Sequence, residues 1–220
     1  MKYVFIIVGV GGTGSLLARD LPKLMIGTSN KMVIIDGDIV EEKNRKRQSY
    51  QKHDVGSNKA IALSAKINSF YGCICEAIDT YVSKDEIKVC LEKYHGYIPV
   101  IIGCVDNDKS RKIMEVTFNE LDKCVYLDSA NSEYEGNVYC CVKQDGVKKG
   151  AIRSENYKLE TDVHPLDKSC QEQASEGNTQ FIVTNMKMAN VLFEHIYYLL
   201  IKKMKVGVTC VGRFKTVHYE

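Results

Sequence analysis

Short continuous apolar runs alternate with amphipathic stretches over the first 130 residues of the chain. The apolar runs predict strands buried on both faces, and apolar positions at a helical period predict the helices that cover them. Strands that alternate with helices are typical of a mostly parallel, doubly wound α/β sheet with right-handed crossovers. The predicted strands are residues 2–8, 32–36, 73–78, 99–105 and 124–128, and the predicted helices are residues 13–20, 57–70, 84–94 and 108–121.

The pattern changes after residue 128. Residues 137–142 alternate weakly and predict a strand, whereas residues 143–177 are polar and predict a long loop or crossover segment. Residues 179–204 carry apolar side chains at helical spacing, which predicts one long helix whose stripe is core or a dimer seam. Two short segments after this helix, residues 207–211 and 215–218, predict a hairpin.

Length and composition favour one domain. The 220 residues, 45% of them apolar, can bury a full α/β core. The net charge of +2 gives no global sign of a nucleic-acid partner. No apolar stretch reaches the roughly 20 residues that span a membrane, so we expect no membrane partner. The single domain, residues 1–220, is expected to divide into a core at 1–130, an irregular crossover region at 131–177, and a helix and hairpin at 178–220.

The nine cysteines indicate neither disulfides nor zinc. The sequence passes from Met1-Lys2 directly into a predicted core strand, with no signal-peptide pattern, so we expect a cytoplasmic protein with free thiols. It contains no Cys-x-x-Cys pair, and we therefore predict no structural zinc. Four cysteines in or beside apolar strands are expected to be small core residues: Cys73, Cys75, Cys104 and Cys124.

A glycine-rich turn follows the first predicted strand. Gly9, Gly11 and Gly14 fit Gly-x-Gly-x-x-Gly, and Gly12 lies between them. Backbone without side chains can approach a phosphate closely, and the amides that begin the next helix favour its charge. Asp36 ends the second strand about 20 residues later, where a carboxylate can accept from ribose hydroxyls. The sequence therefore predicts a Rossmann-like nucleotide-binding core in residues 1–130.

A more specific pattern begins at Asp36 and reads Asp36-Gly37-Asp38-Ile39-Val40-Glu41-Glu42-Lys43-Asn44-Arg45-Lys46-Arg47-Gln48. It resembles the Asp-x-Asp-x-Val-x-x-x-Asn-x-x-Arg-Gln signature of the ThiF/MoeB family, the relatives of ubiquitin-activating enzymes. Residues 55–60 and 104–107 resemble two further segments of that family in the same order. The nearest resemblance is to the ThiF-like protein of the PRTRC plasmid or integrated-element system, through residues 56–60, 66–72 and 165–170.

The resemblance implies that the nucleotide is ATP with Mg²⁺. Asp36 would accept from the ribose, Asp38 would be the second acid of the site, and Asp106 would hold magnesium, which prefers oxygen ligands. Arginine offers a rigid fork to phosphate, and lysine offers a point charge. The implied donors to the triphosphate are Asn44, Arg47 and Lys59.

The implied reaction is attack of a carrier's C-terminal carboxylate on the α-phosphate of ATP. The carrier would be a small ubiquitin-like or sulfur-carrier protein, and the enzyme would be a homodimer, the commonest symmetric assembly. Relatives usually add an arginine from the partner subunit's N-terminal helix. Here nothing precedes the first strand, so that arginine is expected to be either absent or replaced by another residue, such as Arg19 or Arg111.

Two other functions are open. The chain can be a nucleotide-binding accessory protein of a plasmid or integrated element, with the pocket kept and the reaction lost. It can also be a dinucleotide-dependent oxidoreductase that shares only the glycine turn, although hydride transfer gives Asn44, Arg47 and Lys59 no role.

Cys170 lies in the polar segment before the long helix. In several relatives a cysteine of the corresponding crossover loop forms a thioester or persulfide. Lys168 would favour its thiolate, and His164 is the nearest candidate base. The residue is therefore either a catalytic acceptor of the activated carboxylate or an incidental exposed thiol.

Overall fold

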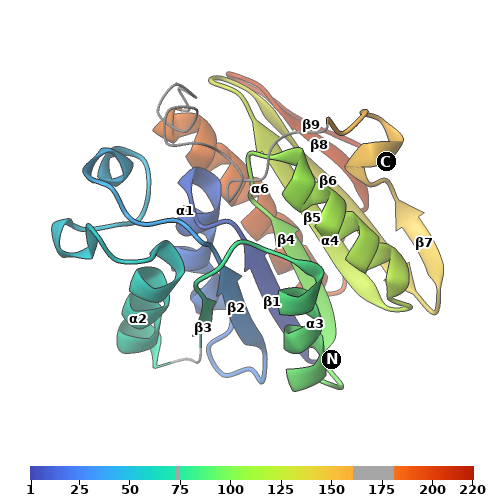
Figure 1. Ribbon diagram of the computed structural model, residues 1–220. Coiled ribbons are helices and arrows are strands. Elements are labelled where there is room, and N and C mark those ends of the chain that lie inside the picture. The colour runs from blue at the N-terminus through green and yellow to red at the C-terminus, as the bar shows by residue number, and fades with distance from the viewer. Residues whose placement is uncertain (73–74, 161–180) are drawn as a thin grey trace.

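One mixed sheet forms the centre of the computed structural model, which describes residues 1–72, 75–160 and 181–220 (Figure 1). The strand order is β3-β2-β1-β4-β5-β6-β8-β9, and β7 pairs with β6. Strands β1 to β5 pair in parallel, and the remaining pairs are antiparallel. Their bounds are β1 Tyr3–Val8, β2 Lys31–Ile35, β3 Cys75–Ile78, β4 Ile98–Gly103, β5 Cys124–Asn131, β6 Gly136–Gln144, β7 Val147–Gly150, β8 Gly207–Val211 and β9 Thr216–Tyr219.

Helices cover both faces of the parallel half of the sheet (Figure 1). In β1, Phe5 and Ile7 point to one face and Ile6 to the other, so each face has its own apolar core. The first core is closed by α1 (Gly12–Asp20), α2 (Lys59–Tyr71) and α6 (Ile182–Leu200), and the second by α3 (Lys84–Lys93) and α4 (Asp108–Glu120). The predicted α/β fold, with its long C-terminal helix and hairpin, is confirmed.

Helix termini follow local side-chain chemistry. The side chain of Asn58 accepts from the Ile61 amide at 3.1 Å, which begins α2 at Lys59. The side chain of Asn107 accepts from the Ser110 amide at 2.9 Å and caps α4 in the same way. Since Asn107 performs this role, the carboxylate of the preceding residue is left for other chemistry.

The antiparallel half contains a strand that the sequence analysis does not predict. Strand β6 continues to Gln144, and β7 begins at Val147, within the stretch expected to be an irregular loop. Asp145 and Gly146 form a two-residue turn in which both φ angles are positive, +51° and +76°. Asp-Gly is a typical sequence for this tight hairpin turn, so the missed signal was present in the residues themselves.

The long helix is shorter than the predicted span, since α6 covers Ile182–Leu200 rather than residues 179–204. It packs against α1 and against strands β5 and β6. Across the described ranges, no helix has the length and apolar character needed to cross a membrane.

Candidate functional site

The glycine turn joins β1 to α1 and is closed by backbone contacts. Gly9 has a φ of +84°, and a Cβ there would lie 2.8 Å from the carbonyl oxygen of Cys104. A Cβ on Gly14 would lie 1.9 Å from the Gly9 oxygen, so both positions exclude side chains. Helix α1 begins at Gly12 without a side-chain cap, which leaves its first amides as donors.

Helix α6 contacts the glycine turn through Asn185. A Cβ on Gly12 would lie 2.4 Å from Nδ2 of Asn185, whose side chain is fully buried. The Asn185 Oδ1 accepts from Asn131 Nδ2 at 3.2 Å, and the Thr13 hydroxyl donates to Asn131 Oδ1 at 3.4 Å. Asn185, which is distant in sequence, therefore shapes the glycine turn. The Gly-x-Gly-x-x-Gly motif gives no indication of this contact.

Asp36 ties the end of β2 to the glycine turn. Its Oδ2 accepts from the Val10 amide at 2.7 Å, and its Oδ1 accepts from the Asp38 amide at 2.9 Å. Burial raises the pKa of Asp36 to about 6, although the nearby Lys59 opposes the shift. The carboxylate is thus held in place and retains lone pairs that can accept from a ligand.

Asp38, Lys59 and Tyr81 form a polar cluster beside Asp36. Lys59 Nζ lies 2.6 Å from Asp38 Oδ2, and the Tyr81 hydroxyl donates to Asp38 Oδ1 at 2.5 Å. Burial alone would raise the pKa of Asp38, but Lys59 and Tyr81 hold it below its usual value. Burial would lower the pKa of Lys59, yet Asp36 and Asp38 raise it, so the ammonium stays charged.

Tyr81 was missed by the motif, although its position after β3 places it at the same edge of the sheet. A Cβ on Gly37 would lie 2.7 Å from Cδ2 of Tyr81, so this glycine makes room for the ring. Burial and the contact with Asp38 raise the pKa of Tyr81, which keeps its hydroxyl protonated as a donor.

Asp106 follows β4 and is exposed. Its charge is among the smaller causes that raise the pKa values of Lys59 and Tyr81, so Asp106 lies within electrostatic reach of this cluster. Within the described ranges, no group of three or more His, Cys, Asp or Glu side chains is arranged to hold a metal. A cation here would therefore depend on ligand oxygens and water in addition to Asp106.

Asn44 and Arg47 lie on the loop that leads from β2 to α2. Asn44 is buried in a short 3₁₀ helix, Glu42–Lys46, where its Oδ1 accepts from the Glu41 amide at 2.8 Å. Its Nδ2 group is the part of the side chain that can donate to a ligand. Arg47 is half-buried and ends this turn.

The residues after Arg47 lie against the glycine turn. The Ser49 amide donates to the Ser15 hydroxyl at 3.1 Å, and Gln48 Nε2 lies 3.8 Å from the position of a Cβ on Gly11. Gln48 is buried, and its Oε1 has no hydrogen-bond partner among the described residues. This unsatisfied acceptor beside the turn fits a site that receives a hydrogen-bond donor from a ligand.

Neither arginine expected to replace the partner's arginine fits that role. Arg19 is in the last turn of α1, at the end away from the glycine turn, and pairs with Asp20 at 2.6 Å. Arg111 is buried and donates to Asp108 at 2.8 Å. The sequence shows the charges of these side chains but not the carboxylates that bind them. Cys170, Lys168 and His164 lie outside the described residues.

The chain is similar in sequence to several known proteins. A model described as the ThiF family matches residues 2–213. The chain is 29% identical over 141 residues to ubiquitin-like modifier-activating enzyme 5 of Bombyx mori, covering 58% of this chain and 33% of that protein. It is 26% identical over 220 residues to a probable molybdopterin-synthase adenylyltransferase of Porphyra purpurea, covering 97% of this chain and 54% of that one.

Solved structures show the same fold. The crystal structure of E. coli MccB with ATP superposes with a TM-score of 0.72 at 14% identity, over 99% of this chain and 63% of that one. The structure of PaaA superposes with a TM-score of 0.68 at 19% identity, over 99% and 64%. The chain thus spans about a third to a half of the curated relatives and just under two thirds of these structures.

Proposed function

Because the chain belongs to the ThiF family, we propose that it adenylylates the C-terminal carboxylate of a small ubiquitin-like or sulfur-carrier protein at the expense of ATP. The observation that carries this proposal is the convergence of the glycine turn, Asp36, Lys59 and Asp106 at the carboxyl ends of β1, β2 and β4. Ligands of open parallel sheets bind at this edge.

The site fits ATP in chemical detail. The buried carboxylate of Asp36 is an acceptor for ribose hydroxyls, and the uncapped amides of α1 are donors to phosphate. The unsatisfied Oε1 of Gln48 can accept from a hydroxyl or an amino group of the nucleoside. Asp106 would hold Mg²⁺ together with phosphate oxygens, and the ion would neutralise charge on the leaving group.

The proposed step needs mainly charge stabilisation. A carboxylate oxygen of the carrier forms a bond to the α-phosphorus, the bond from that phosphorus to the bridging oxygen breaks, and pyrophosphate leaves. Lys59 is held charged by two carboxylates, and Arg47 presents a fork that matches phosphate oxygens. In this proposal both side chains stabilise the charge that develops in the transition state, with Asn44 Nδ2 as a further donor.

The alternative is a nucleotide-binding accessory protein of a plasmid or integrated element that does not carry out this reaction. Membership of the PRTRC subtype, whose proteins belong to such an element, stays a prediction. An accessory protein would keep the ATP pocket but would not exchange pyrophosphate. Homodimerisation, Mg²⁺ and a role for Cys170 are likewise predictions that belong to the enzymatic proposal.

ATP–pyrophosphate exchange tests the proposal. The wild-type protein, incubated with Mg²⁺, labelled pyrophosphate and candidate carriers encoded beside its gene, is expected to form labelled ATP only with a cognate carrier. Lys59→Ala should lose exchange, whereas Lys149→Ala, on the exposed strand β7, should retain it. ATP binding without exchange for every carrier would favour the accessory protein, and stabilisation by NAD but not ATP would contradict both.

Affinity for adenosine should depend on the ionisation of Asp36. Ribose hydroxyls donate to the ionised carboxylate, which predominates above its pKa of about 6. Affinity is therefore expected to be constant at higher pH and to fall about tenfold per pH unit below 6. Calorimetry with adenosine avoids phosphate titration, and Asp36→Asn should give weak, nearly pH-independent binding. An unchanged affinity of the wild type between pH 7 and pH 5 would contradict this assignment.

The outer face of α6 is the proposed seam of a homodimer. Large apolar side chains are exposed along it and just beyond its end, and a twofold axis near its centre would place this apolar stripe against the same stripe of a second copy. Light scattering should give twice the mass of one chain at micromolar concentration. Tyr197→Glu should yield monomers, and Tyr157→Glu, at an exposed site elsewhere, should not. A monomeric wild type would contradict the proposal. The exposed side chains are Val183, Met186, Tyr197, Tyr198 and Ile201.

A further inference from the structure

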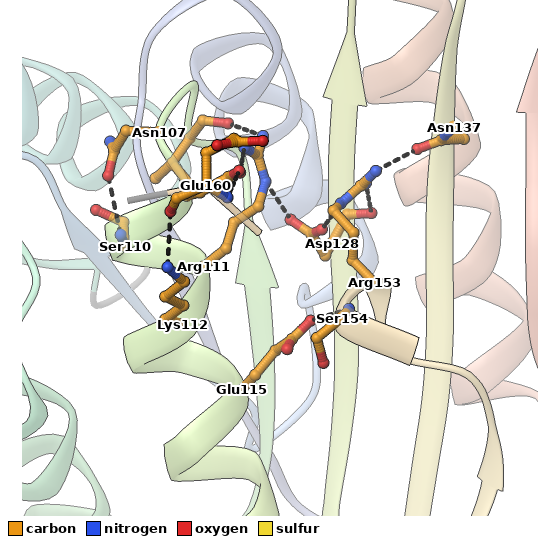
Figure 2. Close-up of polar contacts among 12 residues, drawn as sticks. Asn107, Ser110, Arg111, Lys112, Glu115, Asp128, Asn137, Arg153, Ser154 and Glu160 are labelled. Atoms are coloured by element: carbon orange, nitrogen blue, oxygen red, sulfur yellow. Dashed lines mark hydrogen bonds and ion pairs between the residues drawn. The ribbon is translucent and has the colours of Figure 1, made fainter. Parts of the chain in front are cut away.

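Four charged side chains form a connected network close in sequence and fold to the end of β4, and Figure 2 shows Arg111 and Arg153 on either side of Asp128. Two belong to the first turn of α4, one to β5, and one to the short 3₁₀ helix Arg153–Glu155. The pairs alternate in sign, so each buried charge faces an opposite one. The members of this charged network are Asp108, Arg111, Asp128 and Arg153.

Arg111 binds the chain on both sides of Asp106. Its Nη2 donates to the carbonyl oxygen of Val105, and its Nη1 donates to Asp108 Oδ1 at 2.8 Å. Asp106 itself is exposed and lies between these two anchor points. One planar guanidinium therefore fixes the backbone that presents the carboxylate to the nucleotide site.

Arg111 is in turn held by Asp128. This carboxylate is fully buried and pairs in register with Gly103, the last residue of β4. Its Oδ1 lies 3.4 Å from Arg111 Nε, and its Oδ2 accepts from Arg153 Nε. Burial would lower the pKa of Arg111, but Asp128 and Asp108 raise it, so the guanidinium remains charged. Arg111 Nε and Asp128 Oδ1 make no hydrogen bond among the described residues, so their contact is an ion pair between buried charges in a low local dielectric.

The network also anchors the segment after β7. The Glu160 amide donates to Asp108 Oδ2 at 2.9 Å, and Lys112 Nζ donates to the Glu160 carbonyl at 2.6 Å (Figure 2). The Ser154 amide donates to Glu115 Oε1 at 3.1 Å. Asp108 therefore accepts from Arg111 with one oxygen and from this segment with the other, beside the same loop.

We propose that Arg111 is a positioning residue that sets the location of Asp106 and thereby the affinity of the site for magnesium bound with ATP. This inference rests on the proposed function, because it concerns the metal that ATP would bring. Residues that orient a metal ligand typically change metal affinity 10- to 100-fold when they are replaced. Lysine at this position keeps the charge but cannot bind Val105 and Asp108 with one rigid fork.

The test measures the Mg²⁺ concentration that gives half of the ATP-induced rise in melting temperature. Arg111→Lys should raise this midpoint about tenfold or more, with adenosine affinity unchanged, because adenosine binds without the metal. Lys112→Ala is the matched control, since it releases the Glu160 carbonyl and leaves Arg111 in place. If Arg111→Lys fails to fold, Asp108→Asn, which is partly exposed, replaces it in the same assay with the same expected direction.

A double-mutant cycle separates positioning from general stability. In an Asp106→Asn background, Arg111→Lys should cause no further change in the Mg²⁺ midpoint, whereas independent structural damage would add. A normal midpoint in Arg111→Lys, with a large change in Asp106→Asn, would overturn the positioning role and leave the proposed function intact. Failure of the wild type to bind ATP with Mg²⁺ would overturn both.

Discussion

Replacing Arg47 with alanine is expected to lower ATP–pyrophosphate exchange roughly 100-fold or more while ATP still binds. Negative charge shifts among the oxygens around the α-phosphorus as the carrier attacks, and a guanidinium stabilises that distribution most at the transition state. Arg47 ends a turn that Asn44 closes, and the following Gln48 and Ser49 lie against the glycine turn. The backbone at Arg47 is thus held by the residues on either side of it.

Two variants sharpen the measurement. Arg47→Lys keeps the charge but loses the fork, and it should recover only part of the rate. Arg45→Ala is the matched control, because Arg45 lies two positions earlier and pairs with Glu42. The affinity for ATP is measured in parallel by calorimetry. Normal exchange by Arg47→Ala, with normal ATP binding, would remove Arg47 from the reaction even if the enzymatic proposal holds.

Replacing Gly12 with alanine is expected to destabilise the protein by about 1–3 kcal/mol and to weaken ATP binding. The three atoms nearest to the new Cβ all belong to the side chain of Asn185, and the nearest, Nδ2, would lie at 2.4 Å. Either α6 must move away from the glycine turn, or the turn must lose the shape that presents its amides. Urea denaturation gives the loss in stability, and the thermal shift with ATP gives the loss in binding.

The structure supplies both a rescue and a control for this change. Adding Asn185→Ala to Gly12→Ala removes the clashing amide, so the pair should recover much of the stability that Gly12→Ala loses. Gly11→Ala is the matched control, because its Cβ would have its nearest neighbour at 3.8 Å, an ordinary contact. Equal stability of Gly12→Ala and wild type, or no relief from the second substitution, would show that the contact does not shape the turn.

The parallel half of the fold was predictable because its central strands, β1, β2 and β4, are apolar on both faces. The run Tyr3–Val8 is buried throughout. A short, continuous apolar run of this kind is typical of a strand in a parallel sheet that is covered on both faces. The strand β7 was missed because its four residues are all exposed and carry no apolar pattern. Only the Asp145-Gly146 pair indicates this strand, because Asp-Gly is typical of the tight turn of a hairpin.

The site was predictable as far as local motifs reach. The positions of Asp36 and Lys59 follow from strand ends and a cap, and the structure brings them to one edge of the sheet. Tyr81 and Asn185 act through contacts between distant segments, for which a single sequence contains no periodic signal. Arg111 was expected near the phosphates because a sequence displays charge, whereas its carboxylate partners become visible only in three dimensions.

The contact between Gly12 and Asn185 joins positions about 170 residues apart, and this affects how the protein matures on the ribosome. The ribosome synthesises the glycine turn about 170 residues before the helix that backs it. A nascent chain that has completed β1 to β5 holds Asp36 and the α1 amides but lacks the wall that α6 provides. The proposed nucleotide site is therefore complete only after α6 has left the ribosome and docked against the glycine turn.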